Sequence, residues 1–518
     1  MLASLRTAAV TGVDACPVHV EVDVSFGLPV FTMVGLPDAS VRESRDRVRS
    51  AIRNSGFEFP PHRITVNLAP ADVPKAGAAF DLPIALGVLA AQGVIQQAVV
   101  PDVVILGELS LDGAIQSTRG VLPVAVRARR DGVRGLLLPA GNAPEAAVVD
   151  GLDVIPVTDL ADAVAALNTP ATRRPVPPPL PTVVGRAADL ADVRGQLLAR
   201  RALEIAAAGG HSLLFVGPPG AGKTMLARRL PGILPSLAFD EALDVTAIHS
   251  VAGLLPAGSG LIGERPFRAP HHTASLAALV GGGPHPRPGE ISLAHHGVLF
   301  LDEFAEFPRY ALDGLRQPLE EGQVTIARAG RSVTFPARVV LVAATNPCPC
   351  GYMGDAHHEC RCTPQQAARY AARISGPLRD RIDLTLEVPA LPIDTLQEGR
   401  GGECTASVRA RVVAARARQH GRAGSSITNA QLSAAQLAAH CQLERPAMEL
   451  LRRAASRLGL SARGYERTRR VARTIADLAG AERIDTNHVA ESLQFRFRAP
   501  GNAGEYSAGF PPLDVNAG

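Results

Sequence analysis

The chain has 518 residues, of which 46% are hydrophobic and 20% charged, and its formal net charge is +4. This length predicts about three domains, and so small a net charge does not by itself indicate nucleic-acid binding. The sequence shows no signal-peptide core, no uncharged apolar run of the roughly 18 residues that a membrane span needs, and too few cysteines for a disulfide scaffold, so we expect a cytoplasmic protein that does not enter a membrane.

Five segments follow one another along the chain. Residues 1–167 alternate short apolar and polar runs with alanine-rich stretches, which predicts an α+β domain. Proline clusters in residues 168–181 are typical of an extended linker. Residues 182–388 predict a parallel α/β core, residues 389–498 a helical C-terminal lid, and residues 499–518 a flexible tail.

The first segment contains the run Pro74-Lys75-Ala-Gly-Ala-Ala79-Phe-Asp. It resembles the active-site stretch of Lon proteases, which implies the fold of the second domain of ribosomal protein S5. Lon-type proteolysis needs a serine nucleophile activated by a lysine. Those two positions fall on Ala79 and Leu122, so we expect no peptidase activity. Lys75, one of only two lysines, remains open to two interpretations, an anion ligand or a structural ion pair.

The run GPPGAGKT follows the apolar run SLLFV and precedes the helical run MLARRL. This is a complete phosphate-binding loop in the strand–loop–helix setting that the motif requires. In such a loop, backbone N–H groups surround phosphate, the lysine reaches the β- and γ-phosphates, and the hydroxyl binds Mg²⁺. We therefore expect ATP and Mg²⁺ to bind here, at Gly217, Pro218, Pro219, Gly220, Ala221, Gly222, Lys223 and Thr224.

A second apolar strand, residues 297–301, ends in Asp302 and Glu303. We expect Asp302 to hold Mg²⁺ and Glu303 to polarise the attacking water, as in a Walker B motif. A third apolar strand, residues 338–345, is followed by Asn346, whose side-chain amide is suited to orient that water. Histidine pairs at residues 271–272 and 295–296 flank the acidic strand. With no carboxylate at metal-ligand spacing beside them, we interpret them as packing or hydrogen-bonding residues, with metal binding as the alternative.

The run between the acidic strand and Asn346 alternates apolar and polar residues on both sides of Ala329-Gly330, which predicts a β-hairpin. Arg328 and Arg331 bracket its tip. They are candidates for gripping DNA phosphates, and a solvated tip without a ligand is the alternative.

Four of the seven cysteines follow Asn346 closely, within residues 348–362: Cys348, Cys350, Cys360 and Cys362. Four thiolates so close together fit tetrahedral Zn²⁺, although C-x-C pairs are less usual than C-x₂-C pairs. His357 and His358 are alternative ligands. Free thiols and a redox role are the competing interpretations.

Two arginines complete the candidate site. Arg381, in GPLRDRIDL, is a candidate arginine finger for the ATP of a neighbouring subunit, and Arg463 is a candidate phosphate sensor on a C-terminal helix. A surface salt bridge is the alternative for each. Residues 401–500 also carry 17 arginines against 8 acidic residues, which favours either a polyanion partner or helices with salt-bridged arginines.

The motifs GPPGAGKT, FRAPHHTAS, GEISLAHHGVLFLDE, ATNPCPCG, GPLRDRIDL and RVARTIADL occur in that order. Together they resemble the magnesium-chelatase-like AAA+ ATPases of the YifB/ComM family, over residues 5–498. This resemblance implies an AAA+ core, a homo-oligomeric ring that is expected to be hexameric, a finger at Arg381 acting in trans, and sensors at Asn346 and Arg463. The family's finger motif more usually has leucine at position 379, so Arg379 is a second candidate for the finger.

The resemblance implies a ring-forming ATPase that remodels DNA, as a branch-migration motor in recombination and natural transformation. Two other functions stay open. One is an ATP-dependent protease or unfoldase, against which Ala79 and Leu122 argue. The other is the motor subunit of a magnesium chelatase, which does not typically carry a Lon-like domain such as residues 1–167.

Overall fold

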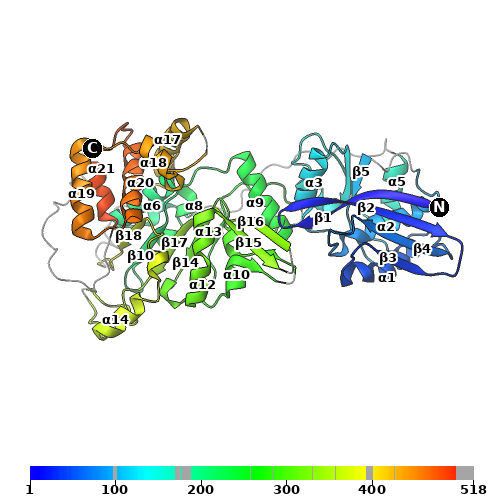
Figure 1. Ribbon diagram of the computed structural model, residues 1–518, viewed down its shortest axis with the longest axis horizontal. Helices are drawn as coiled ribbons and strands as arrows, with labels where there is room; N and C mark the ends of the chain where they lie inside the picture. Colours follow the sequence, from blue (N-terminus) through cyan, green and yellow to red (C-terminus); the bar gives the residue numbers. More distant parts are fainter. Residues whose placement is uncertain are drawn as a thin grey trace.

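The computed structural model shows an elongated molecule with an N-terminal lobe, a central α/β lobe and a helical C-terminal lobe (Figure 1). Among the helices that it describes, none combines the length and apolar character of a bilayer span. The described residues are 1–96, 102–169, 176, 188–256, 258–283, 285–328, 331–355, 357–392, 401–424 and 426–496.

A mixed seven-stranded sheet organises the N-terminal lobe, in the order β3-β4-β2-β1-β5-β8-β9. The long pair β1–β2 is antiparallel, whereas β5, β8 and β9 run parallel to β1 and to one another. The strands are β1 (Leu2–Thr11), β2 (Asp14–Ser25), β3 (Phe31–Val34), β4 (Arg63–Ala69), β5 (Val103–Ile105), β8 (Gly135–Pro139) and β9 (Asp153–Val157), with a separate pair β6 (Glu108–Leu109) and β7 (Ile115–Gln116).

Helices cover both faces of this sheet. Every residue of α2 is buried, which explains why its sequence, DLPIALGVLAA, shows no polar face. The helices are α1 (Ala39–Asn54), α2 (Asp81–Ala91), α3 (Val121–Arg130), α4 (Ala143–Ala146) and α5 (Leu160–Asn168). The predicted mixture of strands and helices is confirmed, while the likeness to the second domain of ribosomal protein S5 stays a prediction.

A five-stranded parallel sheet forms the centre of the second lobe, in the order β11-β14-β17-β10-β18. Its strands are β11 (Phe267–Arg268), β14 (Val298–Leu301), β17 (Val340–Thr345), β10 (Leu213–Val216) and β18 (Leu384–Glu387). Alternate side chains enter two different cores, as period-2 geometry requires. In β10, Leu213 and Phe215 pack on one face and Leu214 and Val216 on the other. The predicted parallel α/β core is confirmed.

The central lobe also holds helices and short hairpins. The helices are α6 (Leu197–Gly209), α7 (Lys223–Ala227), α8 (Leu230–Ile233), α9 (Phe239–Ala252), α10 (Leu276–Val280), α11 (Glu290–Leu293), α12 (Arg309–Gly314), α13 (Arg316–Glu321), α14 (Pro364–Ala371) and α15 (Gly376–Arg379). The pairs β12 (Gly281–Gly282) with β13 (Arg287–Pro288) and β15 (Gln323–Arg328) with β16 (Arg331–Pro336) are antiparallel.

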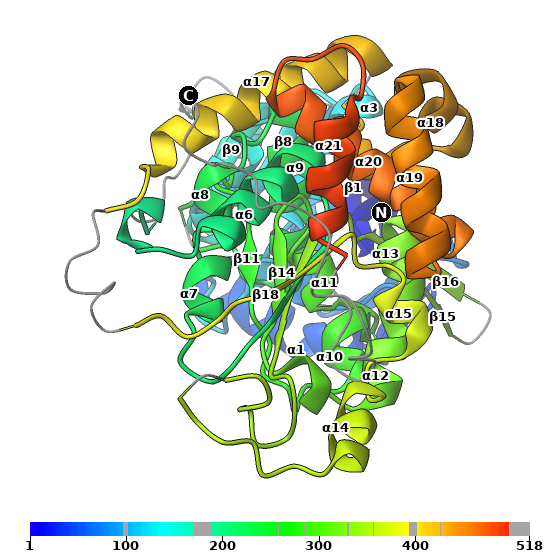
Figure 2. The same cartoon turned by 90° about the vertical axis from the view of Figure 1, so that its left-hand side faces the viewer.

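The C-terminal lobe is helical, as predicted, and part of it completes the core of the parallel sheet (Figure 2). Val408 and Val412 of α17 and Val471 and Ile475 of α20 are buried in the same cluster as Phe215. The lobe is therefore packed firmly on one face of the sheet. Its helices are α17 (Thr405–Ala423), α18 (Ala434–His440), α19 (Arg445–Leu458), α20 (Ala462–Leu478) and α21 (Thr486–Gln494).

The N-terminal and central lobes meet through α3, α4 and α9. Ser250 of α9 donates its hydroxyl to the buried carboxylate of Glu145, and Gly120 donates its N–H to the same hydroxyl at 3.0 Å. Burial raises the pKa of Glu145. Leu122 lies near the Ser250–Glu145 hydrogen bond. It packs in one apolar cluster with Ala242 of the central lobe. The hydrogen bonds of Ser250 with Glu145 and Gly120 therefore join the two lobes.

Candidate functional site

The phosphate-binding loop begins where β10 ends. A side chain at Gly217 would place its Cβ 2.1 Å from the carbonyl oxygen of Val388, so only glycine fits there. Gly220 and Gly222 have φ values of +78° and +86°, which non-glycine residues rarely adopt. The loop then turns into α7, whose first residue is Lys223.

Lys223 lies at the centre of the loop. Its Nζ donates to the carbonyl oxygens of Gly217 at 2.6 Å and Pro218 at 2.8 Å, and to Oδ1 of Asn346 at 3.2 Å. Burial lowers the pKa of Lys223, partly offset by the charge of Asp302. Because the three direct partners are neutral oxygens, a phosphate oxygen at this place would be a stronger partner for the ammonium group.

The two predicted magnesium ligands are in direct contact. Thr224 donates its hydroxyl to Oδ2 of Asp302 at 2.6 Å, and the N–H of Glu303 donates to Oδ1 at 3.0 Å. Glu303 has φ +50°, a left-handed conformation that is uncommon for a residue with a side chain. The structure thus brings Lys223, Thr224, Asp302 and Asn346 to one edge of the sheet.

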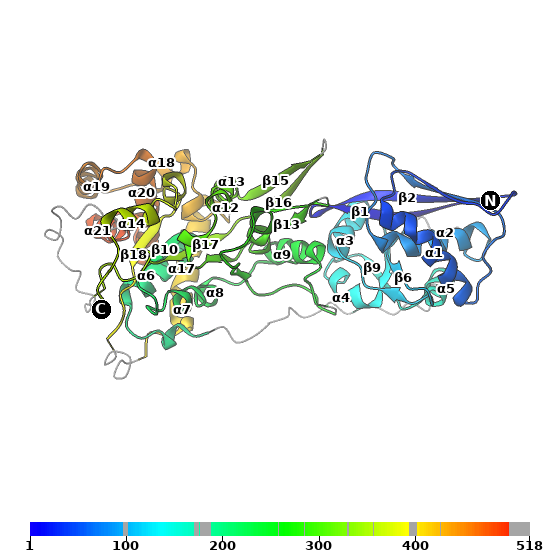
Figure 3. The same cartoon turned by 90° about the horizontal axis from the view of Figure 1, so that it is seen from below.

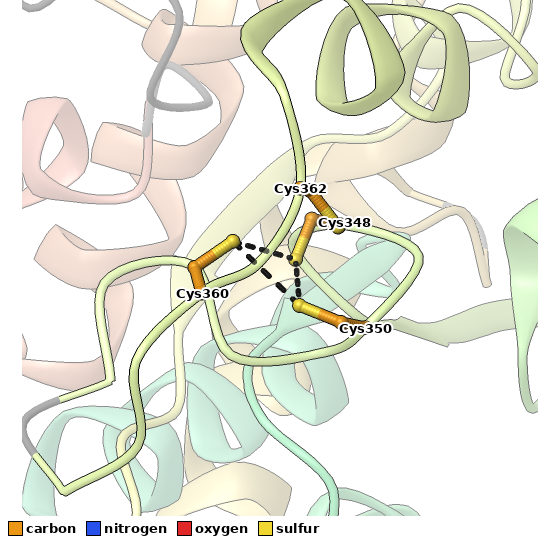
Figure 4. Close-up of side chains that lie close together, drawn as sticks. All are labelled: Cys348, Cys350, Cys360 and Cys362. Atoms are coloured by element: carbon orange, nitrogen blue, oxygen red, sulfur yellow. Dashed lines mark hydrogen bonds between the residues drawn. The ribbon is translucent and has the colours of Figure 1, made fainter.

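The four predicted cysteines form a compact group beside this edge (Figure 4). Their sulfurs all lie within 4.8 Å of one another, and the Cys348–Cys350, Cys348–Cys360 and Cys350–Cys360 distances are 3.3, 3.7 and 3.6 Å. A tetrahedral zinc with sulfur at about 2.3 Å requires sulfur–sulfur distances of about 3.8 Å. The group therefore fits such an ion.

The neighbours of the cysteine group also bear on its role. The backbone N–H of Tyr352 is the main cause that lowers the pKa of Cys350, to about 6. A backbone hydrogen bond also lowers the pKa values of Cys360 and Cys362, but desolvation and the neighbouring sulfurs outweigh it, so that both pKa values are raised. His358 lies 3.3 Å from Asp355 and is not in the described cysteine group, so it is not needed as a ligand. Gly351 lies in close contact with Pro219. A Cβ atom added to Gly351 would stand only 2.7 Å from the proline ring. The cysteine loop therefore packs directly on the phosphate-binding loop.

Arg381 and Arg463 lie together but apart from the phosphate-binding loop of their own chain. Arg381 forms an ion pair with Glu320, and Arg463 approaches the same carboxylate at 3.8 Å. Both line a cavity of about 580 Å³. The second finger candidate, Arg379, instead donates to the carbonyl oxygen of Ala371 at 2.6 Å and lines another cavity.

Strands β15 and β16 form the hairpin that the sequence predicts, with Arg328 opposite Arg331 in the register. Figure 3 shows it extending from the central lobe beside the N-terminal lobe. The turn at Gly12 between β1 and β2 touches it, since a Cβ at Gly12 would stand 2.9 Å from the side chain of Val333. The predicted turn residues Ala329-Gly330 lie outside the described residues.

The Lon-like positions belong to the N-terminal lobe. Leu122 is fully buried at the junction with the central lobe, and Ala79 packs against an apolar cluster. Lys75 is also buried. Its ammonium group donates to the carbonyl oxygen of Pro70, and burial lowers its pKa. The ammonium group is therefore directed into the lobe, toward a backbone oxygen.

The histidine pairs have polar partners that sequence reasoning did not identify. Nδ1 of His272 lies 2.7 Å from Oε2 of Glu303. The fold also brings Asp244 close to His295 and His296. Nδ1 of His295 accepts the N–H of Arg338 at 2.9 Å, and burial lowers the pKa of His295 to about 3. In the neutral ring the proton is then on Nε2, and Asp244, His295 and His296 have ligand atoms within 4.8 Å of one another.

Comparisons with known proteins agree with this arrangement. The family model described as "Magnesium chelatase, subunit ChlI" matches residues 189–396, "Subunit ChlI of Mg-chelatase" matches residues 20–142, and "Magnesium chelatase, subunit ChlI C-terminal" matches residues 402–496.

Relatives match nearly the whole chain. The YifB protein of Salmonella typhimurium is 46% identical over 497 residues, which cover 96% of this chain and 97% of the relative. Competence protein ComM of Haemophilus influenzae is 47% identical over 502 residues, with the same coverage. The Lon protease of Mycolicibacterium smegmatis is 29% identical over 175 residues, which cover 32% of this chain and 22% of that protease. The chain belongs to the YifB/ComM family of magnesium-chelatase-like proteins.

Proposed function

We propose that this protein is an AAA+ ATPase that forms a homo-oligomeric ring, expected to be hexameric, and couples ATP hydrolysis to the remodelling of DNA. The ATPase activity is proposed because four side chains lie together at one edge of the sheet: Lys223, Thr224, Asp302 and Asn346. In the proposed reaction Lys223 would bind the β- and γ-phosphates. Thr224 and Asp302 would hold Mg²⁺, which would neutralise charge at the transferred phosphoryl group. Glu303 polarises the attacking water and Asn346 orients it.

The ring is supported by the position of Arg381. The cavity that it lines contains none of the residues 217–224, so the finger has no access to its own phosphates through that cavity. The guanidinium of Arg381 is paired with Glu320 at this cavity. A phosphate of a neighbouring subunit that entered the cavity would compete with Glu320 for it. Arg463 on the same side would contact the same phosphate.

The DNA client is supported by the hairpin and by the family. The register places Arg328 and Arg331 at the end of the paired strands β15 and β16. Contacts of arginine with phosphates there would act on any DNA sequence. One relative over nearly the full chain is a competence protein. Proteolysis is disfavoured, because Ala79 and Leu122 provide neither a nucleophile nor a base. The chelatase function is the second candidate, since all three family models carry its name.

We also propose that Cys348, Cys350, Cys360 and Cys362 hold a structural zinc. Because Gly351 packs on Pro219, the metal would brace the loop against which the phosphate-binding loop rests. Zinc would supply four bonds to sulfur there and would have a structural role only.

The first prediction concerns ATP chemistry. Lys223→Ala removes the main phosphate contact and should abolish binding of a fluorescent ATP analogue. Glu303→Gln should still bind it but release phosphate about a hundredfold more slowly or worse, because the water loses its base. Near-normal phosphate release by Glu303→Gln would show that another group is the base.

The second prediction tests the DNA client. The double variant Arg328→Ala, Arg331→Ala should show a lower ratio of DNA-stimulated to basal ATPase than the wild type. The negative slope of log affinity against log salt should become shallower by about two for each subunit that contacts DNA, because each such subunit loses two phosphate contacts. The measurements are phosphate release and DNA binding by fluorescence anisotropy between low and moderate salt. An unchanged slope would place the DNA contacts elsewhere.

The third prediction tests the ring. Subunits with Arg381→Ala and subunits with Lys223→Ala should each be inactive alone. In mixed rings, one type of interface pairs an intact ATP site with an intact finger, so part of the ATPase activity should return. Mixed rings confirmed by native mass spectrometry that recover no activity would contradict an arginine finger in trans.

The fourth prediction concerns the metal. Elemental analysis of the purified protein should find about one zinc per chain. Cys348→Ser and Cys360→Ser should each lower the zinc content and the melting temperature. Cys404→Ser, which changes an exposed thiol outside the group, is the matched control and should leave both unchanged. Metal-free wild-type protein with four reactive thiols in the loop would be incompatible with a zinc site.

A further inference from the structure

A small cavity of about 110 Å³ lies between the central and C-terminal lobes. Its polar walls are formed by Glu241, Arg265 and Arg338 of the central lobe and by Arg416, Thr428 and Gln431 of the C-terminal lobe. Gly297 and Val340, at the starts of β14 and β17, also line it. Because these strands are parallel, the cavity lies at the edge of the sheet opposite to the phosphate-binding loop.

The charges around this cavity are mainly positive. Three arginines line it against a single carboxylate, that of Glu241. Glu241 is already engaged, because it forms an ion pair with Arg265 at 2.8 Å and its Oε1 lies 3.4 Å from Nδ1 of His296. The cavity therefore offers no second carboxylate to Arg338 or Arg416.

Arg416 is the arginine whose hydrogen bonds are least complete. Its Nε and Nη2 both donate to the carbonyl oxygen of Ala207, in the last turn of α6, at 3.2 and 2.8 Å. Within the part of the chain that the structure describes, its Nη1 has no hydrogen-bond acceptor. By contrast, Arg411 and Arg422 of the same helix, α17, each form an ion pair with a carboxylate.

The environment of Arg416 is unfavourable for an unpaired charge. Burial is the main cause that lowers the pKa of Arg416 to about 10, and the positive charge of Arg265 acts in the same direction. A charge that is removed from water destabilises a protein unless an opposite charge pairs with it. An anion in this cavity would therefore stabilise the arrangement of the two lobes.

The size and the donors of the cavity indicate the class of anion. A volume of about 110 Å³ holds several water molecules, but it is well below the roughly 300–1,000 Å³ of sites for drug-sized ligands. The planar guanidinium group matches the oxygens of phosphate. The hydroxyl of Thr428 donates to Oε1 of Gln431 at 3.3 Å, a long bond that a charged acceptor could replace. These features favour a small oxyanion over a nucleotide or a DNA strand.

We propose that this cavity binds one inorganic phosphate ion, which pairs with Arg416 and joins the C-terminal lobe to the central lobe. Nη1 of Arg416 donates to a phosphate oxygen from the C-terminal lobe, and the charges of Arg265 and Arg338 attract the ion from the central lobe. Because both lobes contribute, the ion stabilises their packing. This inference depends neither on ATP hydrolysis nor on DNA binding.

The experiment measures phosphate binding by isothermal titration calorimetry at constant ionic strength. Saturating Mg²⁺ and a non-hydrolysable ATP analogue fill the phosphate-binding loop, so that it does not take up the added phosphate. Arg416→Gln removes the proposed partner of the ion. Arg338→Gln removes a charge from the opposite wall at an exposed position, where folding is unlikely to depend on it. Arg452→Gln, the matched control, removes an exposed charge of α19 outside the cavity.

The wild type should bind about one phosphate per chain. Arg416→Gln should weaken this binding about tenfold or more, because a hydrogen bond to a charged group is lost. Arg338→Gln should weaken it about threefold, since an exposed charge is screened by solvent, and Arg452→Gln should match the wild type. Phosphate should also slow amide hydrogen exchange in α17 of the wild type about twofold or more, and this effect should be lost in Arg416→Gln.

Four results would overturn the inference. The first is a wild type that binds no phosphate when the phosphate-binding loop is filled. The second is binding that neither Arg416→Gln nor Arg338→Gln weakens, which would place the ion elsewhere. The third is binding without slower exchange in α17, which would refute the joining of the lobes. The fourth is displacement of phosphate by a short single-stranded oligonucleotide, which would show that the cavity takes a phosphate group of DNA instead of the free ion.

Discussion

The parallel order of β14, β17 and β10 is the constraint on which the candidate site depends. Parallel neighbours end at the same edge of a sheet, so the residues after these strands meet there although they are far apart in the sequence. The hydrogen bonds of Lys223 to Asn346 and of Thr224 to Asp302 join the three strand ends. The cysteine loop contacts this edge directly, since a Cβ at Gly351 would stand 2.7 Å from the ring of Pro219.

The C-terminal arginine excess has a largely structural use. Asp477 receives ion pairs from both Arg422 and Arg473, and Asp383 receives one from Arg467. Asp383 also lies 3.0 Å from the buried His211, which connects the helical lobe to the start of β18. Arg467 therefore joins the lobe to the parallel sheet, whereas Arg422 and Arg473 stabilise α17 and α20 within the lobe. The charge excess is therefore weak support for a polyanion partner, and the hairpin carries most of that argument.

Sequence patterns predicted the features whose residues are close together in the chain. The phosphate-binding loop and the acidic strand end could be predicted because each motif combines a local backbone conformation with the side chains that it needs. The sequence predicted the cysteine group but left two histidines as alternative metal ligands. In the fold, His358 pairs with Asp355 and lies outside the group of four sulfurs. Contacts between distant residues could not be predicted, because nothing in the sequence around Glu320, His272 or Ser250 indicates which partner the fold will bring to it.

The central claim is that ATP hydrolysis at this sheet edge drives the movement of branched DNA. The most direct test is a four-way junction with fluorescently labelled arms, mixed with the wild-type protein and either ATP or a non-hydrolysable analogue. The account predicts that the arms exchange with ATP, that they do not exchange with the analogue, and that Glu303→Gln is inactive with both. Steady ATP consumption by the wild type in the presence of a junction whose arms never exchange would contradict it.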